Sequence, residues 1–218
     1  MHQRARSVED KQRRAEDLLD AARVLAAELG GVRHVTLAAV TERAGLHPSG
    51  VRRYFASKEE LLLELAERGW GEWRDILTAR LTGQHDLGPA ETAKVISATI
   101  SSLPLFCDLL THIPLTLESD VDLPRARRYK ANSFAAYDVI IGALRTASVL
   151  DAAQAEDLIT VTLALTANLW QLAHPTNSLR QLYAEVPRWG HAALEFESRL
   201  ARLLTAAATG LATAGQTA

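Results

Sequence analysis

The sequence predicts an all-α protein of about nine helices, and three observations support that prediction. No segment shows the sustained alternation of apolar and polar residues that marks a half-buried strand. Apolar residues instead recur at intervals of three and four in almost every long segment, which is the spacing of one helix face. Alanine and leucine dominate these segments, whereas glycine and proline lie mainly at the breaks between them, where helices end.

The N-terminal part contains one long and two short predicted helices. Ser7 can cap the first helix, and the glycine pair that begins at Gly30 ends it. A second, short helix is expected over residues 36–43, and a third over residues 47–53. Pro48 lies in the first turn of this third helix, where its missing N–H leaves no backbone hydrogen bond unmade.

Capping signals and prolines predict the remaining helices. Ser57 and Glu60 form the pattern of a capping box, so a long helix is expected from there to about residue 80. Asp151 and Gln154 give a second start of this kind, for a helix that Pro175 stops. Further helices are marked by Ile96, Pro104, Pro124 and Pro187.

Residues 36–55 have the pattern of a helix-turn-helix, in which two short helices meet at a turn that contains glycine. Gly45 can adopt the left-handed backbone of that turn, and Val51 and Phe55 are expected to anchor the second helix to the core. An outward-facing arginine on such a helix can bond both acceptors of guanine in the major groove of DNA. The residues left facing outward are His47, Pro48, Ser49, Arg52 and Arg53.

The stretch from Thr36 to Leu62 resembles the signature of the TetR-type (TetR/AcrR) family of transcriptional regulators. That family opens the second helix with threonine, turns at Ala-Gly, and follows an aromatic-rich recognition helix with Phe-x-Ser-Lys-Glu-x-Leu. The resemblance is specific over about residues 14–70, and beyond them it rests on helix number and length. The positions that match are Thr36, Ala44, Gly45, Tyr54, Phe55, Ser57, Lys58, Glu59 and Leu61.

Two residues depart from the family pattern. Arg52 stands where the family often has a tyrosine that touches phosphate, so a charge-assisted contact would replace that bond. The glycine of the recognition helix, usually at position 49, is shifted to Gly50. Because a glycine inside a helix costs about 1 kcal/mol relative to alanine, we expect this helix to become fully ordered only on DNA.

The resemblance implies a DNA-binding transcriptional regulator that is not an enzyme. It further implies a repressor that a small apolar or aromatic effector releases from a two-fold-related operator. Five basic residues of an N-terminal arm follow the DNA backbone or minor groove, or else form a solvated surface; they are Arg4, Arg6, Lys11, Arg13 and Arg14. The DNA-contact residues that the resemblance implies are Thr36, His47, Pro48, Ser49, Gly50, Arg52, Arg53, Tyr54 and Lys58.

The distribution of charge supports a DNA partner at the N-terminal end. The whole chain has a formal net charge of −2. Residues 1–58 hold 11 Lys and Arg against 7 Asp and Glu, a net charge of +4, whereas residues 59–218 hold 13 against 19, a net charge of −6. A basic end on an acidic body is expected where only that end meets phosphate.

The resemblance divides the chain into an arm and helix-turn-helix domain at 1–57, a helical ligand-binding and dimerisation domain at 58–210, and a frayed tail at 211–218. The helices expected over 151–174 and 187–208 carry apolar stripes that require a partner. In the family fold these two helices pair into a four-helix homodimer interface, and packing within one subunit is the alternative. The implied interface residues are Leu158, Leu165, Leu169, Trp189, Phe196, Leu200 and Leu203.

A pocket for a small-molecule effector is expected among the helices of the second domain. Pockets are mostly apolar and carry a few placed polar groups. The aromatic residues at helical spacing are alternatively part of the core. The candidate lining residues are Trp70, Trp73, Ile100, Phe106, His112, Phe134, Tyr137, Asn168 and Trp170.

Other features narrow the classes of protein. No run of about 18 apolar residues is present to span a membrane, and the charged N-terminus lacks the apolar stretch of a signal peptide. Cys107, the single cysteine, fits the reducing cytoplasm, where the protein would be nucleoid-associated when bound to DNA. The seven histidines show no i, i+4 pairing, so neither a metal nor a cofactor is expected. Two alternatives remain: a helical protein-binding adaptor without DNA binding, and a small helical enzyme, although no catalytic motif occurs.

Overall fold

A computed structural model of the chain describes residues 2–192 and 195–214, without the side chains of residues 2–8, 48–49 and 191–192. Its α-helices are α1 (His2–Leu29), α2 (Leu37–Arg43), α3 (Lys58–Leu81), α4 (Pro89–Ser101), α5 (Pro104–His112), α6 (Leu123–Ala147), α7 (Ala152–Ala173), α8 (Asn177–Glu185) and α9 (Phe196–Ala214). The shorter elements are three 3-10 turns and one π-helical segment, namely η1 (Val32–His34), η2 (Pro48–Arg53), η4 (Pro187–Ala192) and the π-helical η3 (Ile113–Leu117). The described residues contain no strand, only an isolated bridge between Leu87 and Ser148, so the all-α prediction is confirmed.

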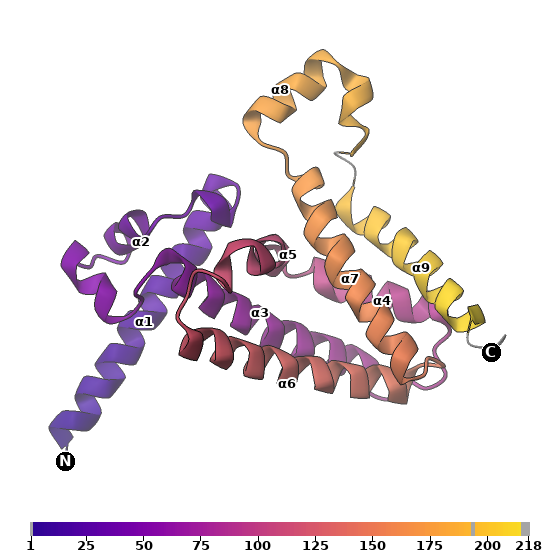
Figure 1. Cartoon of the computed structure of the whole chain (residues 1–218), viewed down its shortest axis with the longest axis horizontal. Helices are drawn as coiled ribbons and strands as arrows, with labels where there is room; N and C mark the ends of the chain where they lie inside the picture. Colours follow the sequence, from indigo (N-terminus) through magenta and orange to yellow (C-terminus); the bar gives the residue numbers. More distant parts are fainter. Residues whose placement is uncertain (1, 193–194, 215–218) are drawn as a thin grey trace.

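The helices form two parts, which Figure 1 shows side by side. We call residues 2–57, with α1, α2 and η2, the head, and the helices from α3 onward the body. In the body α3 lies along α6, α4 packs against α9, and α7 packs against both α5 and α9. The segment with α8 and η4 projects away from the other body helices (Figure 1). Among the described residues no single helix is long and apolar enough to cross a membrane; only α4 together with the segment Pro104–Leu117, bent by 90°, meets that test by length and composition.

Side-chain caps fix the starts of two long body helices. The Ser57 hydroxyl accepts a hydrogen bond from the Glu60 N–H at 3.1 Å, and the Glu60 carboxylate accepts one from the Ala56 N–H. Asp151 and Gln154 form a complete capping box at the start of α7. These bonds satisfy N–H groups that the first turn of a helix leaves without partners. Both predicted helix starts are therefore confirmed.

Three element boundaries differ from the sequence-based expectation. The first helix begins at His2, so Ser7 lies inside α1 and is not its cap. Pro187 begins the turn η4, and the last helix begins only at Phe196. That helix continues to Ala214, beyond the expected start of a frayed tail at residue 211. The remaining tail, residues 215–218, lies outside the described residues.

Helix α8 is an element that the sequence analysis missed. Thr176 caps it, because its hydroxyl accepts a hydrogen bond from the Leu179 N–H at 3.3 Å. No residue of α8 is buried, and Leu179 and Leu182 are 40% and 37% exposed. Leu179 and Leu182 are spaced as on one helix face, but the nine residues of α8 are fewer than the roughly eleven over which helical periodicity is judged.

An aromatic cluster fills the centre of the body. Trp70 and Trp73 of α3 and Phe106 of α5 are at most 7% exposed, and their ring centroids lie 5.6 to 6.2 Å apart. Gly69 permits this approach, because a Cβ atom there would lie 2.4 Å from a ring carbon of Phe106. The indole N–H of Trp70 donates to the Tyr129 hydroxyl at 3.1 Å, which satisfies a polar group inside the core. The cluster thus joins α3, α5 and α6.

Charged side chains also join α3 to α6. Arg125 of α6 is only 6% exposed, and its guanidinium donates to Glu67 at 2.9 Å and to Glu64 at 3.3 Å. Arg128 is 53% exposed and contacts the same two carboxylates. Because a buried charge is tolerated only with partners, the two glutamates are what allow Arg125 to lie inside the body.

Cys107 is buried in the body core, and we expect its thiol to be unreactive in the folded protein. Its sulfur donates to the Ile100 carbonyl at 3.2 Å, and burial raises the pKa of the thiol to about 12. Since the thiolate is the nucleophile, iodoacetamide at neutral pH should leave the native protein unmodified and alkylate it after unfolding in urea. Intact-protein mass spectra of both samples check this, and rapid alkylation of the native protein would contradict it.

Candidate nucleic-acid interface

The helix-turn-helix of the head is built from α2, a glycine turn and η2. Thr36 caps α2, because its hydroxyl accepts a hydrogen bond from the Ala39 N–H at 3.2 Å. Gly45 has a φ of +63°, the left-handed conformation that the sequence predicted for the turn. Val40 is fully buried, and Leu46 packs half-buried against the core. These contacts fix the direction in which η2 leaves the turn.

The second segment of the motif is a 3-10 helix, which corrects the prediction of an α-helix over residues 47–53. The Gly50 N–H bonds the His47 carbonyl at 2.8 Å, and the Tyr54 N–H bonds the Val51 carbonyl at 2.9 Å, three residues back in each case. Gly50 gives this short segment additional backbone freedom, and that freedom weakens the preference of the segment for the α-helix. The predicted anchors are confirmed, since Val51 and Phe55 are each 6% exposed.

Arg52 and Arg53 are the exposed cations of η2. Both side chains are exposed, whereas Val51 and Phe55 beside them are buried. In the part of the chain that the structure describes, neither arginine pairs with a carboxylate. Their guanidinium groups therefore remain available to an acceptor outside the subunit. Of the other predicted contact residues, His47 is exposed and Gly50 is half-buried, and the side chains of Pro48 and Ser49 lie outside the described residues.

Three further predicted contact residues flank η2. Thr36 is exposed at the start of α2, and Tyr54 is half-buried against the core. Lys58 lies at the start of α3, and its ammonium donates to the Arg33 carbonyl at 3.0 Å. An ammonium carries three N–H donors, so this bond leaves donors for a phosphate. Helix N-termini at Thr36 and Lys58 also favour negative charge.

The basic N-terminal arm is part of helix α1. Arg13 pairs with Asp10 at 2.8 Å and Arg14 with Asp17 at 3.3 Å, one helical turn apart in each case. These pairs reduce the net positive charge that the arm presents, whereas Lys11 is exposed. The side chains of Arg4 and Arg6 lie outside the described residues.

The two glycines of the motif are expected to respond oppositely to alanine. At Gly45 the positive φ strains any side chain, so Gly45→Ala should lower the free energy of unfolding by about 1–2 kcal/mol. At Gly50 the φ is not positive and a Cβ atom would meet open space among the described residues. Gly50→Ala should therefore raise that free energy by up to about 1 kcal/mol. Urea titrations at one protein concentration check both values, and equal destabilisation by the two variants would refute this explanation.

The residues that the sequence analysis predicted to line a pocket do not surround one cavity. Four of them are packed in the body core, namely Trp70, Trp73, Ile100 and Phe106. Phe134 is 58% exposed and lies beside Tyr137 on α6, with ring centroids 6.1 Å apart. Asn168 is exposed and His112 is half-buried. Trp170 alone of the nominated residues lines the large cavity described next.

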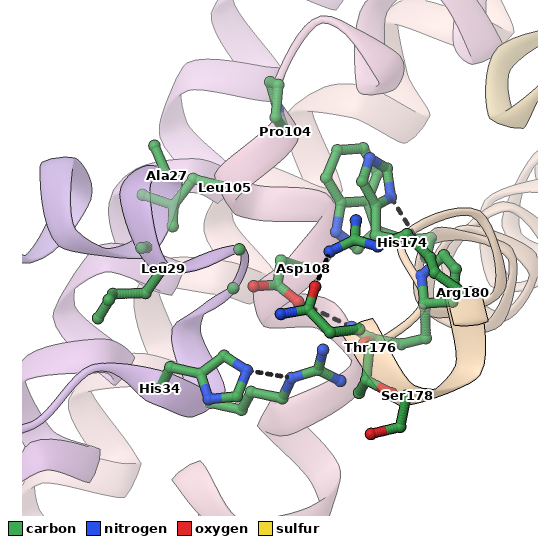
Figure 2. A pocket seen from close by; sticks show the side chains of 18 of the residues that line it. Ala27, Leu29, His34, Pro104, Leu105, Asp108, His174, Thr176, Ser178 and Arg180 are labelled. Atoms are coloured by element: carbon green, nitrogen blue, oxygen red, sulfur yellow. Dashed lines mark hydrogen bonds between the residues drawn. The ribbon is translucent and has the colours of Figure 1, made fainter. Parts of the chain in front are cut away.

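A cavity of about 620 Å³ lies at the junction of head and body. In Figure 2, Ala27, Leu29 and His34 of the head lie on one side of it, His174 and Arg180 lie on the other, and Asp108 lies between them. The full lining is Arg23, Ala26, Ala27, Leu29, Gly30, Gly31, Arg33, His34, Pro104, Leu105, Asp108, Trp170, Gln171, His174, Pro175, Thr176, Asn177, Ser178 and Arg180.

Asp108 connects the head to the body at the base of this cavity. One of its carboxylate oxygens accepts the Val32 N–H at 2.7 Å, and the other accepts the Gln171 side-chain amide at 2.8 Å. These bonds satisfy the carboxylate oxygens of a residue that is only 7% exposed. His112 lies 3.9 Å away, and burial lowers its pKa although Asp108 acts in the opposite direction. No sequence pattern indicated this group, because its members are 63 and 76 residues apart.

The residues nominated for a dimer interface fall into two groups. Leu158 and Leu200 are fully buried inside one subunit, and Leu169 is 8% exposed. These three belong to the subunit core and do not face a partner, which differs from the prediction; α7 and α9 pack on each other there, and α9 also packs on α4. Leu165, Phe196 and Leu203 are half-buried, and Trp189 on η4 is 45% exposed.

Comparison with known protein families gives two matches. Residues 18–65, which contain most of the head, match the model described as bacterial regulatory proteins, tetR family. Residues 67–215 match the model described as the tetracyclin repressor-like, C-terminal domain, which by itself covers more than half of the chain. No curated protein matches the sequence significantly. The two matches together cover the helix-turn-helix and the body helices.

Proposed function

Because the chain belongs to the TetR family of bacterial regulatory proteins, we propose that it is a repressor which a small effector releases from a two-fold-related operator. The family consists of DNA-binding transcriptional regulators and not of enzymes, and that general assignment holds for this chain. The observation that carries the finer proposal is the exposed pair Arg52 and Arg53, on a segment that Val51 and Phe55 anchor to the core.

We assign different tasks to the residues of the interface. Arg52 and Arg53 contact base edges, because a guanidinium matches the two acceptors that guanine presents in the major groove. Thr36, Tyr54 and Lys58 contact phosphates at the edges of that groove, where they set the register without reading sequence. Ser49 is proposed to contact base edges as well, and the remaining proposed contact residues are His47, Pro48 and Gly50, in the turn and first residues of η2.

A second copy of this chain is the proposed partner of the body. Helices α7 and α9 pack together, and each has a half-buried apolar flank beside its buried face. Such flanks are typical of surfaces that become buried on association. A dimer also places two recognition segments about one DNA turn apart, which fits a two-fold-related site. The flank residues are Val161, Leu165 and Leu172 of α7 and Phe196, Leu203 and Ala207 of α9.

Charged substitutions on the proposed dimer flanks of α7 and α9 are expected to weaken dimerisation. Glutamate at Leu165 or Leu203 would be buried without a partner, so each variant is expected to raise the dimer dissociation constant by about a hundredfold or more. Leu115→Glu is the control, since Leu115 is 67% exposed on η3, away from the flanks. Sedimentation velocity over a dilution series measures the constants. Dimerisation that is unchanged in both flank variants would place the interface elsewhere.

Release of DNA requires that the effector distinguish two arrangements of the heads. A ligand shifts such an equilibrium only by the difference between its affinities for the two states. We propose that the effector favours a separation or tilt of the heads that no longer matches the two half-sites. An apolar or aromatic effector fits the apolar residues available among the body helices and at the head–body junction.

Selection of duplexes from a random pool tests the proposed function. The wild-type dimer should enrich a two-fold-related sequence, with half-sites about one helical turn apart. Its affinity for that sequence should fall steeply with salt, because phosphate contacts release counterions. An adaptor protein with this acidic net charge would retain no duplex. If no sequence is enriched and no duplex is retained at low salt, the assignment of the head as a DNA-reading module is wrong.

A further inference from the structure

The cavity at the head–body junction has a positive rim. Arg33 approaches it from the head and Arg180 from the body, and both side chains are exposed. Neither arginine pairs with a carboxylate among the described residues; Arg33 donates to His34 at 2.9 Å, and Arg180 donates to the Asn177 side chain. Of the lining residues, only Asp108 is acidic, and each of its oxygens accepts one hydrogen bond, from Val32 and from Gln171.

The rest of the lining is apolar or aromatic. Trp170 stands on one wall, held in place by stacking on His174 with ring centroids 3.9 Å apart and by an edge contact with Phe196. Ala27 and Leu105 line the opposite side, where Figure 2 shows them next to each other. The volume of about 620 Å³ falls in the range of cavities that enclose a small organic ligand. The site therefore offers an apolar wall beside cationic groups.

We infer that this junction cavity is the effector site, and that its ligand is an amphipathic carboxylate with an aromatic or aliphatic body. This inference rests on the proposed function and names the ligand class for it. The carboxylate is placed between Arg33 and Arg180, because a planar guanidinium binds carboxylate in a charge-assisted, often bidentate manner. The apolar body of the ligand packs against Trp170 and Leu105.

The position of the cavity gives the ligand a way to act on DNA binding. Its walls come from both parts of the molecule: α1 and η1 of the head, and α5, α7 and α8 of the body. Arg33 of the head and Arg180 of the body carry like charges on the two sides of the cavity. An anion bound between them would attract both and so hold the head to the body. The bond from Val32 to Asp108 crosses the same junction, so the cavity lies where the head is held to the body. A bound ligand thereby selects one orientation of the head.

Calorimetric titration of the full-length dimer tests the ligand class with matched probes. Naphthoate carries the carboxylate and naphthamide replaces it with an uncharged group of nearly the same shape. Dodecanoate distinguishes an aliphatic from an aromatic ligand body. Naphthoate or dodecanoate should bind, and the aromatic acid should bind about tenfold or more tightly than its amide, since hydrogen bonds between charged groups are the stronger ones.

Variants of the lining locate the binding. Arg33→Gln and Arg180→Gln should each remove most of the preference for naphthoate over naphthamide and leave the amide affinity nearly unchanged. Arg145→Gln is the matched control, because Arg145 is exposed at the end of α6 and is not part of the lining. Ala27→Trp should fill the cavity and abolish binding of both acids. Ala27 is exposed on α1, so thermal unfolding of this variant is expected to match the wild type.

Several results would overturn the inference. These are no binding of either acid, equal affinity for acid and amide, arginine variants that bind as the control does, or Ala27→Trp that binds as the wild type. Saturating ligand should change operator affinity by about fivefold or more, and an unchanged affinity would overturn its regulatory part. The proposed function is tested separately: it fails if ligand-free wild-type protein retains no duplex. That result would leave the calorimetric result unaffected.

Discussion

Alanine at Arg52 or Arg53 is expected to weaken operator binding more than any other single substitution in the head. A bidentate contact to guanine contributes about 1–3 kcal/mol of discrimination. A dimer on a two-fold-related operator would make each contact twice, so one substitution should cost about 2–6 kcal/mol, which is roughly thirtyfold to twenty-thousandfold in affinity. The loss should be specific, because the variant tolerates a changed base at the position that the arginine reads. Fluorescence anisotropy on the selected operator and on single-base variants measures both effects.

Two comparisons make this result diagnostic. Arg145→Ala removes an exposed arginine far along the chain and should leave operator affinity unchanged. A residue that contacts phosphate behaves differently from one that contacts a base: its loss weakens binding to all sequences alike and reduces the salt slope by about one unit per contact. If Arg52→Ala shows that second behaviour, Arg52 is a phosphate contact in place of the family tyrosine. If both arginine variants bind as the wild type does, η2 does not read DNA.

Removal of Arg125 is expected to destabilise the fold more than removal of any exposed charge. Arg125→Ala leaves Glu64 and Glu67, which are 20% and 13% exposed, close together without their buried cation. Breaking a buried pair from one side costs about 3–5 kcal/mol, and the partial exposure of the two carboxylates places the expected loss near the lower value. Urea unfolding at a fixed protein concentration measures the change, since the stability of the proposed dimer would depend on concentration.

Arg128 provides an internal control for that measurement. It contacts the same two glutamates, but its side chain is 53% exposed. Exposed ion pairs contribute up to about 1 kcal/mol, so Arg128→Ala should lower the free energy of unfolding by no more than that. If both variants lower the free energy of unfolding by similar amounts, the loss comes from leaving Glu64 and Glu67 with one fewer cation, and not from the burial of Arg125.

The sequence predicted best those features that depend on neighbours within a few residues. Ser57 and Asp151 cap helices because each needs only a partner three residues ahead. The anchors Val51 and Phe55 follow from helical spacing, and Gly45 from the backbone of the turn. The same local reasoning failed for η2, because spacing alone does not distinguish an α-helix from a 3-10 turn of six residues.

Features that depend on distant residues could not be predicted in this way. The cavity lies where Asp108 bonds both Val32 and Gln171, and no periodic pattern relates residues so far apart. The burial of Leu158 and Leu200 inside one subunit could not be predicted either. An apolar stripe shows that a helix face packs against something, but not whether that is the same subunit or a second one. Which side of α7 faces α9 and which faces solvent is decided only when the helices pack.

The length of α3 has a consequence for the geometry of the proposed dimer. This helix has 24 residues, which corresponds to about 36 Å, and it begins at Lys58 beside the recognition segment and ends in the body at Leu81. Ion pairs from Arg68 to Glu16 and from Arg23 to Glu72 attach the first helix of the head along it. Such a rod works as a lever: a tilt of roughly 5° about one end displaces the other by about 3 Å, which approaches the rise of one base pair.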